Sequence, residues 1–139
     1  KRIAVQEYGV ANPELVTGLV RRGASVKTIA IYRWALPEDL EPLRDAIQRI
    51  LGGDDDVALF TNGAQVEHLF RVAAAENTDA ELGLACGRLV IGSVGPICTQ
   101  VLQRFGLNPD VEPAHPKMGF LIAEIAASAQ QILGAKRSI

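Results

Sequence analysis

Four short turns carry the residues best placed to bind a charged ligand. They comprise residues 6–9, 60–63, 93–96 and 112–117, and each follows a predicted strand and precedes a predicted helix. The first turn of a helix has free backbone N–H groups and the positive end of the helix dipole, so carboxylates and phosphates bind there. In open parallel sheets, ligands bind at the carboxyl ends of the strands, where such turns lie. The same glycines and prolines also serve simply to turn the chain, so an anion site is one of two interpretations of each turn.

Few side chains in this sequence could act as an acid or a base. Tyr32 ends a predicted strand, and its phenol, with an ordinary pKa of about 10, is a neutral hydrogen-bond donor near pH 7. A strand-end tyrosine at an interface is the alternative. His115 is expected to be exposed in a loop, and His68 is expected in mid-helix without a catalytic role. Arg33 and Lys117 could pair with carboxylates of a ligand or with solvent alone.

Several common functional classes lack their sequence signatures. The dinucleotide motif GxGxxG, the phosphate loop GxxxxGK and the hydrolase motif GxSxG are absent, so nicotinamide, ATP and serine-hydrolase chemistry are not supported. Cys86 and Cys98 are spaced neither as CxxC nor as a zinc site, so we expect buried reduced thiols and no metal. A net charge of −2 without a basic cluster argues against nucleic-acid binding.

Neither a membrane span nor a signal peptide is expected. The apolar residues 119–127 fall short of the roughly 18 needed to cross a bilayer, and they include Glu124. A signal peptide is not visible, so we expect a cytoplasmic protein. The acidic residues 54–56 and the basic residues 136–137 are expected to form a solvated loop and a solvated tail.

The composition and the hydrophobic pattern predict an α/β protein. Of the 139 residues, 48% are hydrophobic but only 5% are aromatic, so the core must be built from aliphatic side chains, as in strands packed under helices. The alternation of strands and helices implies parallel sheets flanked by helices. The expected strands are 3–6, 25–33, 57–60, 89–94 and a short edge strand 110–112. The expected helices are 13–22, 40–51, 65–75, 79–86, 97–105 and 116–133.

The chain is expected to contain parts of two domains. Pro37 and the acidic residues beside it mark a boundary near residues 34–40. Residues 1–33 are too few to form a domain alone, and we expect them to be the last βα unit and connecting strand of an α/β domain whose remainder is missing. Residues 34–139 are expected to form the terminal α/β domain, preceded by a short linker. Because the chain starts with Lys1, upstream sequence is expected to be missing.

At its turns the sequence resembles the uroporphyrinogen-III synthase family. The resemblance is carried by VQEYG at residues 5–9, by GA at 23–24 leading to IYR at 31–33, and by LFTN at 59–62 with QV at 65–66. It continues with VGP at 94–96, GL at 106–107 and the stretch 113–121. Each motif alone is weak, but together they follow the family's order and spacing over about residues 2–127.

The resemblance implies a two-domain α/β architecture in which the chain crosses twice between the domains, with this chain as the C-terminal half. It also implies a cyclising lyase of haem biosynthesis that converts hydroxymethylbilane to uroporphyrinogen III, with inversion of ring D and loss of water. Members of the family use neither cofactor nor metal. The implied partner is a linear tetrapyrrole with several carboxylates, bound by a cytoplasmic monomer.

The resemblance further implies a set of site residues. Tyr32 matches the tyrosine proposed to assist departure of the hydroxyl group. Gly95 is expected to leave room for the substrate to approach the backbone. The residues expected to contact the substrate are Gln6, Tyr8, Gly9, Thr61, Asn62, Gly63, Gln65, Ser93, Gly95, Pro96, Ile97, Cys98 and Lys117.

Two departures from the family pattern keep other functions open. Asn62 stands where the family usually has Ser, and Ile97 and Cys98 stand where many members have hydroxyl residues. These changes motivate an alternative function, a non-catalytic relative that binds a tetrapyrrole or has a regulatory role. A third interpretation is a generic flavodoxin-like or periplasmic-type binding domain, which keeps the fold without the chemistry.

Overall fold

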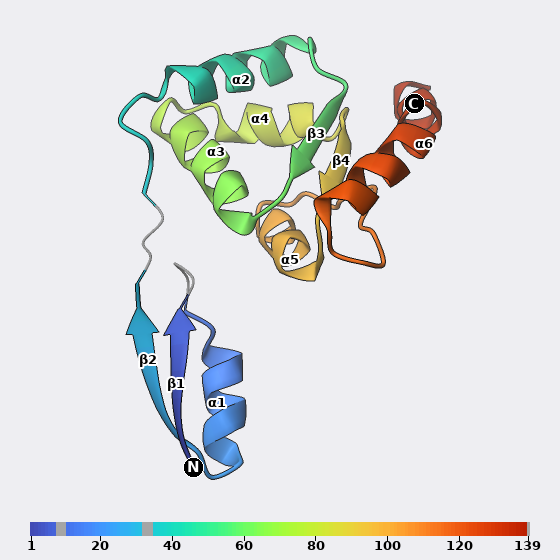
Figure 1. Ribbon diagram of the computed structural model, residues 1–139. Helices are drawn as coiled ribbons and strands as arrows, with labels where there is room; N and C mark the ends of the chain where they lie inside the picture. Colours follow the sequence, from blue (N-terminus) through green and yellow to red (C-terminus); the bar gives the residue numbers. More distant parts are fainter. Residues whose placement is uncertain (8–10, 32–34, 139) are drawn as a thin grey trace. The chain divides into compact units, whose positions relative to one another are not determined.

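The computed structural model describes residues 1–7, 11–31 and 35–138. These residues form two compact units, Lys1–Pro37 and Glu38–Ile139, which are described separately (Figure 1). Both units combine parallel strands with helices, as the sequence predicted.

The first unit is a single βαβ motif. Strand β1 (Arg2–Glu7) is followed by helix α1 (Pro13–Arg21) and strand β2 (Ser25–Ala30), and the two strands pair in parallel. The helix begins where the sequence predicted it, because the Asn12 side chain accepts a hydrogen bond of 3.0 Å from the Leu15 N–H. After the helix, Gly23 adopts a left-handed φ of 80° that suits glycine. None of the residues of α1 is buried, so this unit has little core of its own.

The second unit contains the main hydrophobic core. Its elements are α2 (Glu41–Gly52), β3 (Val57–Phe60), α3 (Gly63–Ala75), α4 (Asp79–Cys86), β4 (Val90–Ser93), α5 (Pro96–Arg104) and α6 (Met118–Arg137). Strands β3 and β4 pair in parallel, with Val57 opposite Val90 and Phe60 opposite Ser93. The predicted edge strand 110–112 is reduced to one parallel bridge between Val111 and Gly92. The last helix starts and ends later than the predicted 116–133.

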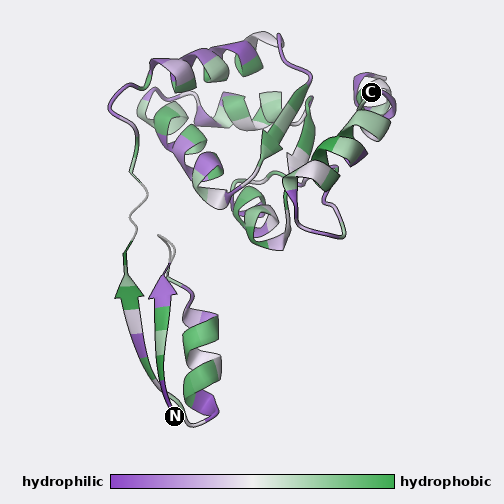
Figure 2. Ribbon diagram, viewed as in Figure 1, coloured by the Kyte–Doolittle hydropathy of each residue, from purple (hydrophilic) through white to green (hydrophobic). Residues whose placement is uncertain are grey.

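Helices cover both faces of the β3–β4 pair. Figure 1 shows α6 on one side of these strands and α2, α3 and α4 on the other. On the α6 side, a core cluster contains Val90, Val111, Leu121 and Ile125. Figure 2 shows that hydrophobic residues run along β3 and along much of α6.

Gly92 permits the close approach of α6 to the sheet. A Cβ at this position would lie 2.6 Å from Leu59 Cδ2 and 3.1 Å and 3.2 Å from the Cδ1 atoms of Leu121 and Ile125. Strand β4 therefore requires a residue without a side chain where the helix crosses it.

The C-terminal end of α6 is anchored, which corrects the expectation of a solvated tail. Lys136 Nζ donates to the carbonyl oxygen of Leu89 at 2.6 Å and to Asp110 Oδ2 at 2.7 Å. Arg137 pairs with Asp56, and both side chains stay more than half exposed, so the acidic loop is solvated as expected. The acidic loop and the basic helix end are thus joined to each other.

Helix α6 is longer than the apolar stretch on which the expectation about membrane-spanning segments was based, and that expectation stays a prediction. By length and composition alone, its 20 residues would suffice to cross a bilayer. The expectation from the sequence considered only the apolar residues 119–127, which are the first part of this helix. In this structure Leu121 and Ile125 are the buried residues of α6, in one cluster with Val90 of β4, and most of the other residues of the helix are exposed.

Candidate functional site

Three turns of the second unit meet at the carboxyl ends of its strands. The Val94 N–H donates to the Phe60 carbonyl oxygen at 3.0 Å, and the Ser93 N–H donates to the Val111 carbonyl oxygen at 2.9 Å. These bonds place the starts of the turns 61–62, 94–95 and 112–117 side by side. The structure therefore brings three of the four predicted turns to one edge, which we call the rim.

At the N-terminus of α3, most of the predicted contact groups are already engaged. The Asn62 side chain accepts from the Gln65 N–H at 3.0 Å, and Gln65 Oε1 accepts from the N–H groups of Thr61 at 2.8 Å and Asn62 at 3.4 Å. This reciprocal arrangement is a capping box. A ligand could use these donors only by displacing Gln65 or Asn62.

Gly63 has a packing role at the start of the same helix. A Cβ on this glycine would lie 2.6 Å from Val101 Cγ2 of α5. The absence of a side chain thus lets α3 and α5 approach each other, independently of any ligand.

The N-terminus of α5 offers a different environment. Gly95 is the N-cap residue, Pro96 opens the helix, and no side chain among the described residues caps it. The amides of Ile97 and Cys98 lie in the first turn, where a helix provides no intrahelical acceptor. Ile97 is 68% exposed, so solvent reaches this helix end. Of the helix ends at the rim, that of α5 is therefore more available to an anion than that of α3.

Gly95 has a different role from the one expected. A Cβ built on Gly95 would lie 2.7 Å from Pro116 Cβ. The direction that a side chain would take is filled by the protein itself and not left open for a ligand. Glycine at this position lets the turn before α5 contact the turn before α6.

Ser93, Thr99 and Glu112 form a hydrogen-bonded network behind the α5 N-terminus. The Ser93 side chain is fully buried, and its Oγ donates to the Gly95 carbonyl oxygen at 3.0 Å. Thr99 Oγ1 lies 2.8 Å from Ser93 Oγ and also contacts the Glu112 carboxylate. Sequence reasoning named Ser93 but gave no role to Thr99 or to the Glu112 side chain. The five residues between Ser93 and Thr99 include the turn from β4 into α5, so no periodic pattern could reveal the contact between the two hydroxyls.

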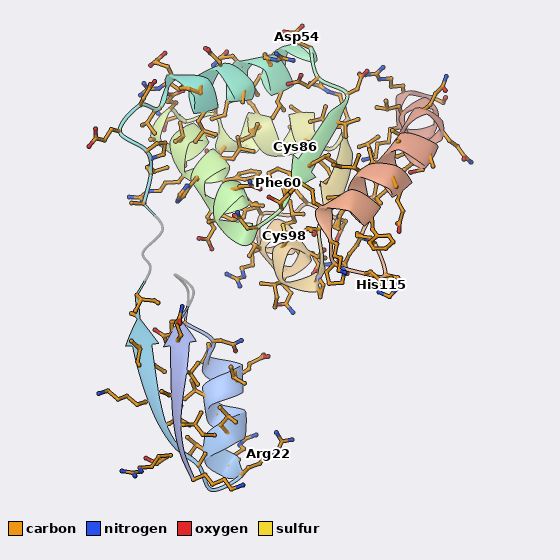
Figure 3. The ribbon with its side chains drawn as sticks, viewed as in Figure 1. Arg22, Asp54, Phe60, Cys86, Cys98 and His115 are labelled. Atoms are coloured by element: carbon orange, nitrogen blue, oxygen red, sulfur yellow. The ribbon has the colours of Figure 1, made fainter. Side chains whose placement is uncertain are left out.

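Cys98 is part of the core beneath the rim. Its Sγ lies 3.5 Å from the Phe60 carbonyl oxygen, to which it donates, and Figure 3 shows these two residues close together. Burial raises the pKa of the Cys98 thiol, and this effect outweighs its hydrogen bonds to Ser93 and Val94. The thiol is therefore neutral and directed inward. Cys86 is likewise a buried free thiol, as the sequence predicted for both cysteines.

Lys117 occupies the start of α6. Its backbone N–H donates to the His115 carbonyl oxygen at 2.7 Å, and its own carbonyl accepts from the Leu121 N–H at 3.1 Å. His115 is exposed, as expected, and its ring centroid lies 5.4 Å from that of Phe120. Figure 3 shows His115 in the loop that leads into α6.

The remaining predicted residues belong to the first unit. Gln6 lies on β1, is exposed, and is paired in register with Ile29 of β2. Tyr8, Gly9 and Tyr32 lie outside the residues that the structure describes. Their roles stay predictions.

Comparison with known proteins identifies the family. The family model described as "Uroporphyrinogen-III synthase HemD" matches residues 1–123, which is most of the chain. The chain belongs to the uroporphyrinogen-III synthase family. The resemblance read from the turns at residues 5–9, 59–66 and 94–96 is therefore confirmed.

Three individual proteins are similar to this chain, one by its solved structure and two by sequence. A native crystal structure of the wild-type synthase from Thermus thermophilus matches with a TM-score of 0.68 and 27% identity, covering 96% of this chain and 51% of that one. A protein of Methanothermobacter thermautotrophicus named "Putative uroporphyrinogen-III synthase" is 32% identical over 127 residues, which are 91% of this chain and 49% of the relative. The Bacillus subtilis protein YjjA, of uncharacterized function, is 28% identical over 127 residues, or 91% of this chain and 47% of that protein. The chain thus spans about half the length of the curated relatives it matches.

Proposed function

We propose that this chain forms part of a uroporphyrinogen-III synthase, which cyclises hydroxymethylbilane to uroporphyrinogen III with inversion of ring D and loss of water. The observation that carries the proposal is the family match over residues 1–123, in a fold whose TM-score to the Thermus synthase is 0.68. The exposed N-terminus of α5 at the rim supports it, because the substrate is a polycarboxylate.

The proposed reaction depends more on how the substrate is positioned than on a strong acid or base. The pyrrole nitrogen supplies the electron pair that breaks the bond to the departing hydroxyl, which leaves as water after it takes a proton. Without the enzyme the substrate still closes, but to the unrearranged isomer I. Holding the flexible chain in one folded geometry therefore provides most of the required selectivity.

In this proposal the N-termini of α5 and α6 bind the substrate's carboxylates. The amides of Ile97 and Cys98 lie in the first turn of α5, at the positive end of the helix dipole. Lys117 adds a positively charged side chain at the start of α6. Backbone amides do not depend on side-chain type, so the Ile97 and Cys98 departures from the family pattern leave these donors in place.

Tyr32 is proposed to donate the proton to the departing hydroxyl. This role comes from the family resemblance, since the structure does not describe Tyr32. Gln6, Tyr8 and Gly9 are proposed to contact the substrate from the first unit on the same ground. We also propose a cytoplasmic, monomeric enzyme that needs no cofactor.

A non-catalytic tetrapyrrole-binding relative is the second candidate. It is favoured by the side chains at the α5 N-terminus, where Ile97 is an exposed hydrocarbon and Cys98 is directed into the core. Neither provides the hydroxyl that many family members have there. Analysing the uroporphyrin isomers made from hydroxymethylbilane separates the two candidates, because only a synthase raises the share of isomer III.

A further inference from the structure

Three separate contacts join the end of β4 and the first part of α5 to the segment that precedes α6. The Ser93 N–H donates to the Val111 carbonyl oxygen at 2.9 Å. Gly95 lies so close to Pro116 that a Cβ would come within 2.7 Å of the proline Cβ. The Thr99 hydroxyl contacts the Glu112 carboxylate. Of these contacts, only that between Thr99 and Glu112 joins two side chains, so it can be removed by substitution without changing a glycine or a proline of a turn.

The hydroxyl protons in this network have a limited set of arrangements. Ser93 and Thr99 have one hydroxyl proton each, whereas the Gly95 carbonyl and an ionised Glu112 only accept. Ser93 gives its proton to the Gly95 carbonyl oxygen, so the single Thr99 proton is directed either to the Ser93 oxygen or to the Glu112 carboxylate, and the charged carboxylate is the stronger acceptor. The Gly95 carbonyl also accepts from the Thr99 N–H at 3.0 Å, which closes the first turn of α5. Thr99 is thus bonded both to the start of its own helix and to the turn before α6.

We propose that Thr99 and Glu112 are positioning residues that hold the N-terminus of α5 at a fixed distance from the N-terminus of α6. Resting on the proposed function, the pair sets the spacing at which the amides of Ile97 and Cys98 and the charge of Lys117 meet two carboxylates of one substrate. Neither Thr99 nor Glu112 need touch the substrate.

Substitutions at Glu112 can separate two effects: the hydrogen bond that its oxygen accepts, and the repulsion between its charge and the substrate. A carboxylate beside a site for a polycarboxylate opposes binding through like-charge repulsion. Glu112→Gln keeps an oxygen that accepts from Thr99 but removes the charge, whereas Glu112→Ala removes both. If the oxygen matters for positioning, Glu112→Gln gives a KM equal to or below that of the wild type, while Glu112→Ala raises KM. Equal KM values for the two variants would contradict the proposal.

The decisive comparison uses Thr99→Val and Thr99→Ser in the full-length protein. Valine matches the shape of threonine but has no hydroxyl, while serine restores the hydroxyl. Thr99→Val loses one hydrogen bond to a charged group. From the usual net contribution of such a bond, we expect KM to rise about five- to tenfold, with kcat within about twofold of the wild type. Thr99→Ser should return KM to near the wild-type value. Thr17→Val, an equivalent substitution on the exposed surface of α1, is the matched control.

A measurement independent of activity accompanies the kinetics. Amide hydrogen exchange at residues 94–98 and 113–117 should quicken in Thr99→Val and not in Thr99→Ser, while exchange in the middle of α3 stays unchanged. Unchanged exchange at both turns, or a Thr99→Val enzyme with wild-type KM, would overturn the positioning role. If the wild-type protein yields only isomer I, the proposed function fails, and the exchange result still decides whether Thr99 and Glu112 fix the two turns.

Discussion

Lys136 Nζ lies 2.7 Å from Asp110 Oδ2, and this pair fastens the last turn of α6 to the start of β4. Asp110 Oδ2 also accepts from the Ile91 N–H at 2.7 Å, and Lys136 donates to the Leu89 carbonyl oxygen at 2.6 Å. Both side chains are mostly buried, with 22% and 18% of their surfaces exposed. One aspartate oxygen therefore connects the helix end, the strand and the turn that leads to the rim.

Replacing Lys136 with Met should destabilise the protein. The methionine keeps an apolar stem of similar length but removes two charge-assisted hydrogen bonds, so we expect a loss of about 2–3 kcal/mol in the free energy of unfolding. Urea denaturation measures it. Arg137→Met is the matched control, because its pair with Asp56 is more than half exposed and should cost no more than about 1 kcal/mol. Equal losses in the two variants would show that the Lys136 contacts contribute nothing beyond a surface pair.

Gly92→Ala should destabilise the interface between α6 and the sheet. The new Cβ would lie 2.6 Å from Leu59 Cδ2, so the surrounding side chains must shift, at a cost of about 1–3 kcal/mol. Adding Leu59→Ala removes the clashing atom, so the double variant should be more stable than the sum of the two single losses predicts.

Gly134→Ala is the control for that substitution. A Cβ at Gly134 meets nothing within 4 Å, and in a helix alanine is preferred to glycine by roughly 0.5–1 kcal/mol. It should therefore be neutral or stabilising in thermal unfolding. If Gly92→Ala behaved in the same way, the close approach of α6 would not depend on the glycine.

The stability of the protein should fall in alkaline solution because of Cys86. Burial raises the pKa of the Cys86 thiol from its ordinary value of 9.0 to about 11. Between these values the unfolded chain loses the thiol proton while the folded chain keeps it, so the free energy of unfolding decreases as pH rises. The contribution of this thiol is complete below pH 9 and falls by up to about 1.4 kcal/mol for each pH unit up to pH 11.

A comparison with Cys86→Ala isolates that effect from other groups that titrate at high pH. We expect the variant to show a shallower loss of stability between pH 9 and pH 11 in urea titrations, whatever its stability at pH 7. Parallel curves for the two proteins would mean that the thiol titrates alike in the folded and unfolded chains.

Tyr32→Phe in the full-length protein should lower kcat with little change in the fold. The substitution removes only the hydroxyl that we propose donates the proton to the departing group. The effect should be modest, because the pyrrole nitrogen already drives departure of the hydroxyl. The measurement is turnover of hydroxymethylbilane, with circular dichroism as the check on folding. Turnover equal to that of the wild type would remove Tyr32 from the proposed catalytic role.

Much of the fold could be predicted from local patterns. The helix over 79–86 and the strand over 57–60 occur with the predicted bounds, because the apolar spacing and the flanking turns are local signals. The edge strand over 110–112 was predicted too long. In the structure the side chain of Asp110, and not its backbone, binds the Ile91 N–H, so regular pairing is interrupted.

The contacts that shape the rim could not be predicted in the same way. Thr99 and Glu112 are separated by 13 residues and belong to different elements, so their contact depends on how the elements pack. The same holds for Gly95 and Pro116, whose close approach gives the glycine a role that its position before a helix did not reveal. The family resemblance depends on these turns, but it does not specify which of their polar groups are already bonded.

The most direct test of the proposed activity is the isomer composition of the product. Fresh hydroxymethylbilane is supplied to the full-length protein, the product is oxidised, and the porphyrin isomers are separated, with heat-denatured protein and buffer alone as blanks. We predict that isomer III predominates with the folded protein and isomer I in both blanks. Isomer I alone from a folded protein would contradict the synthase proposal and favour a tetrapyrrole-binding or regulatory relative.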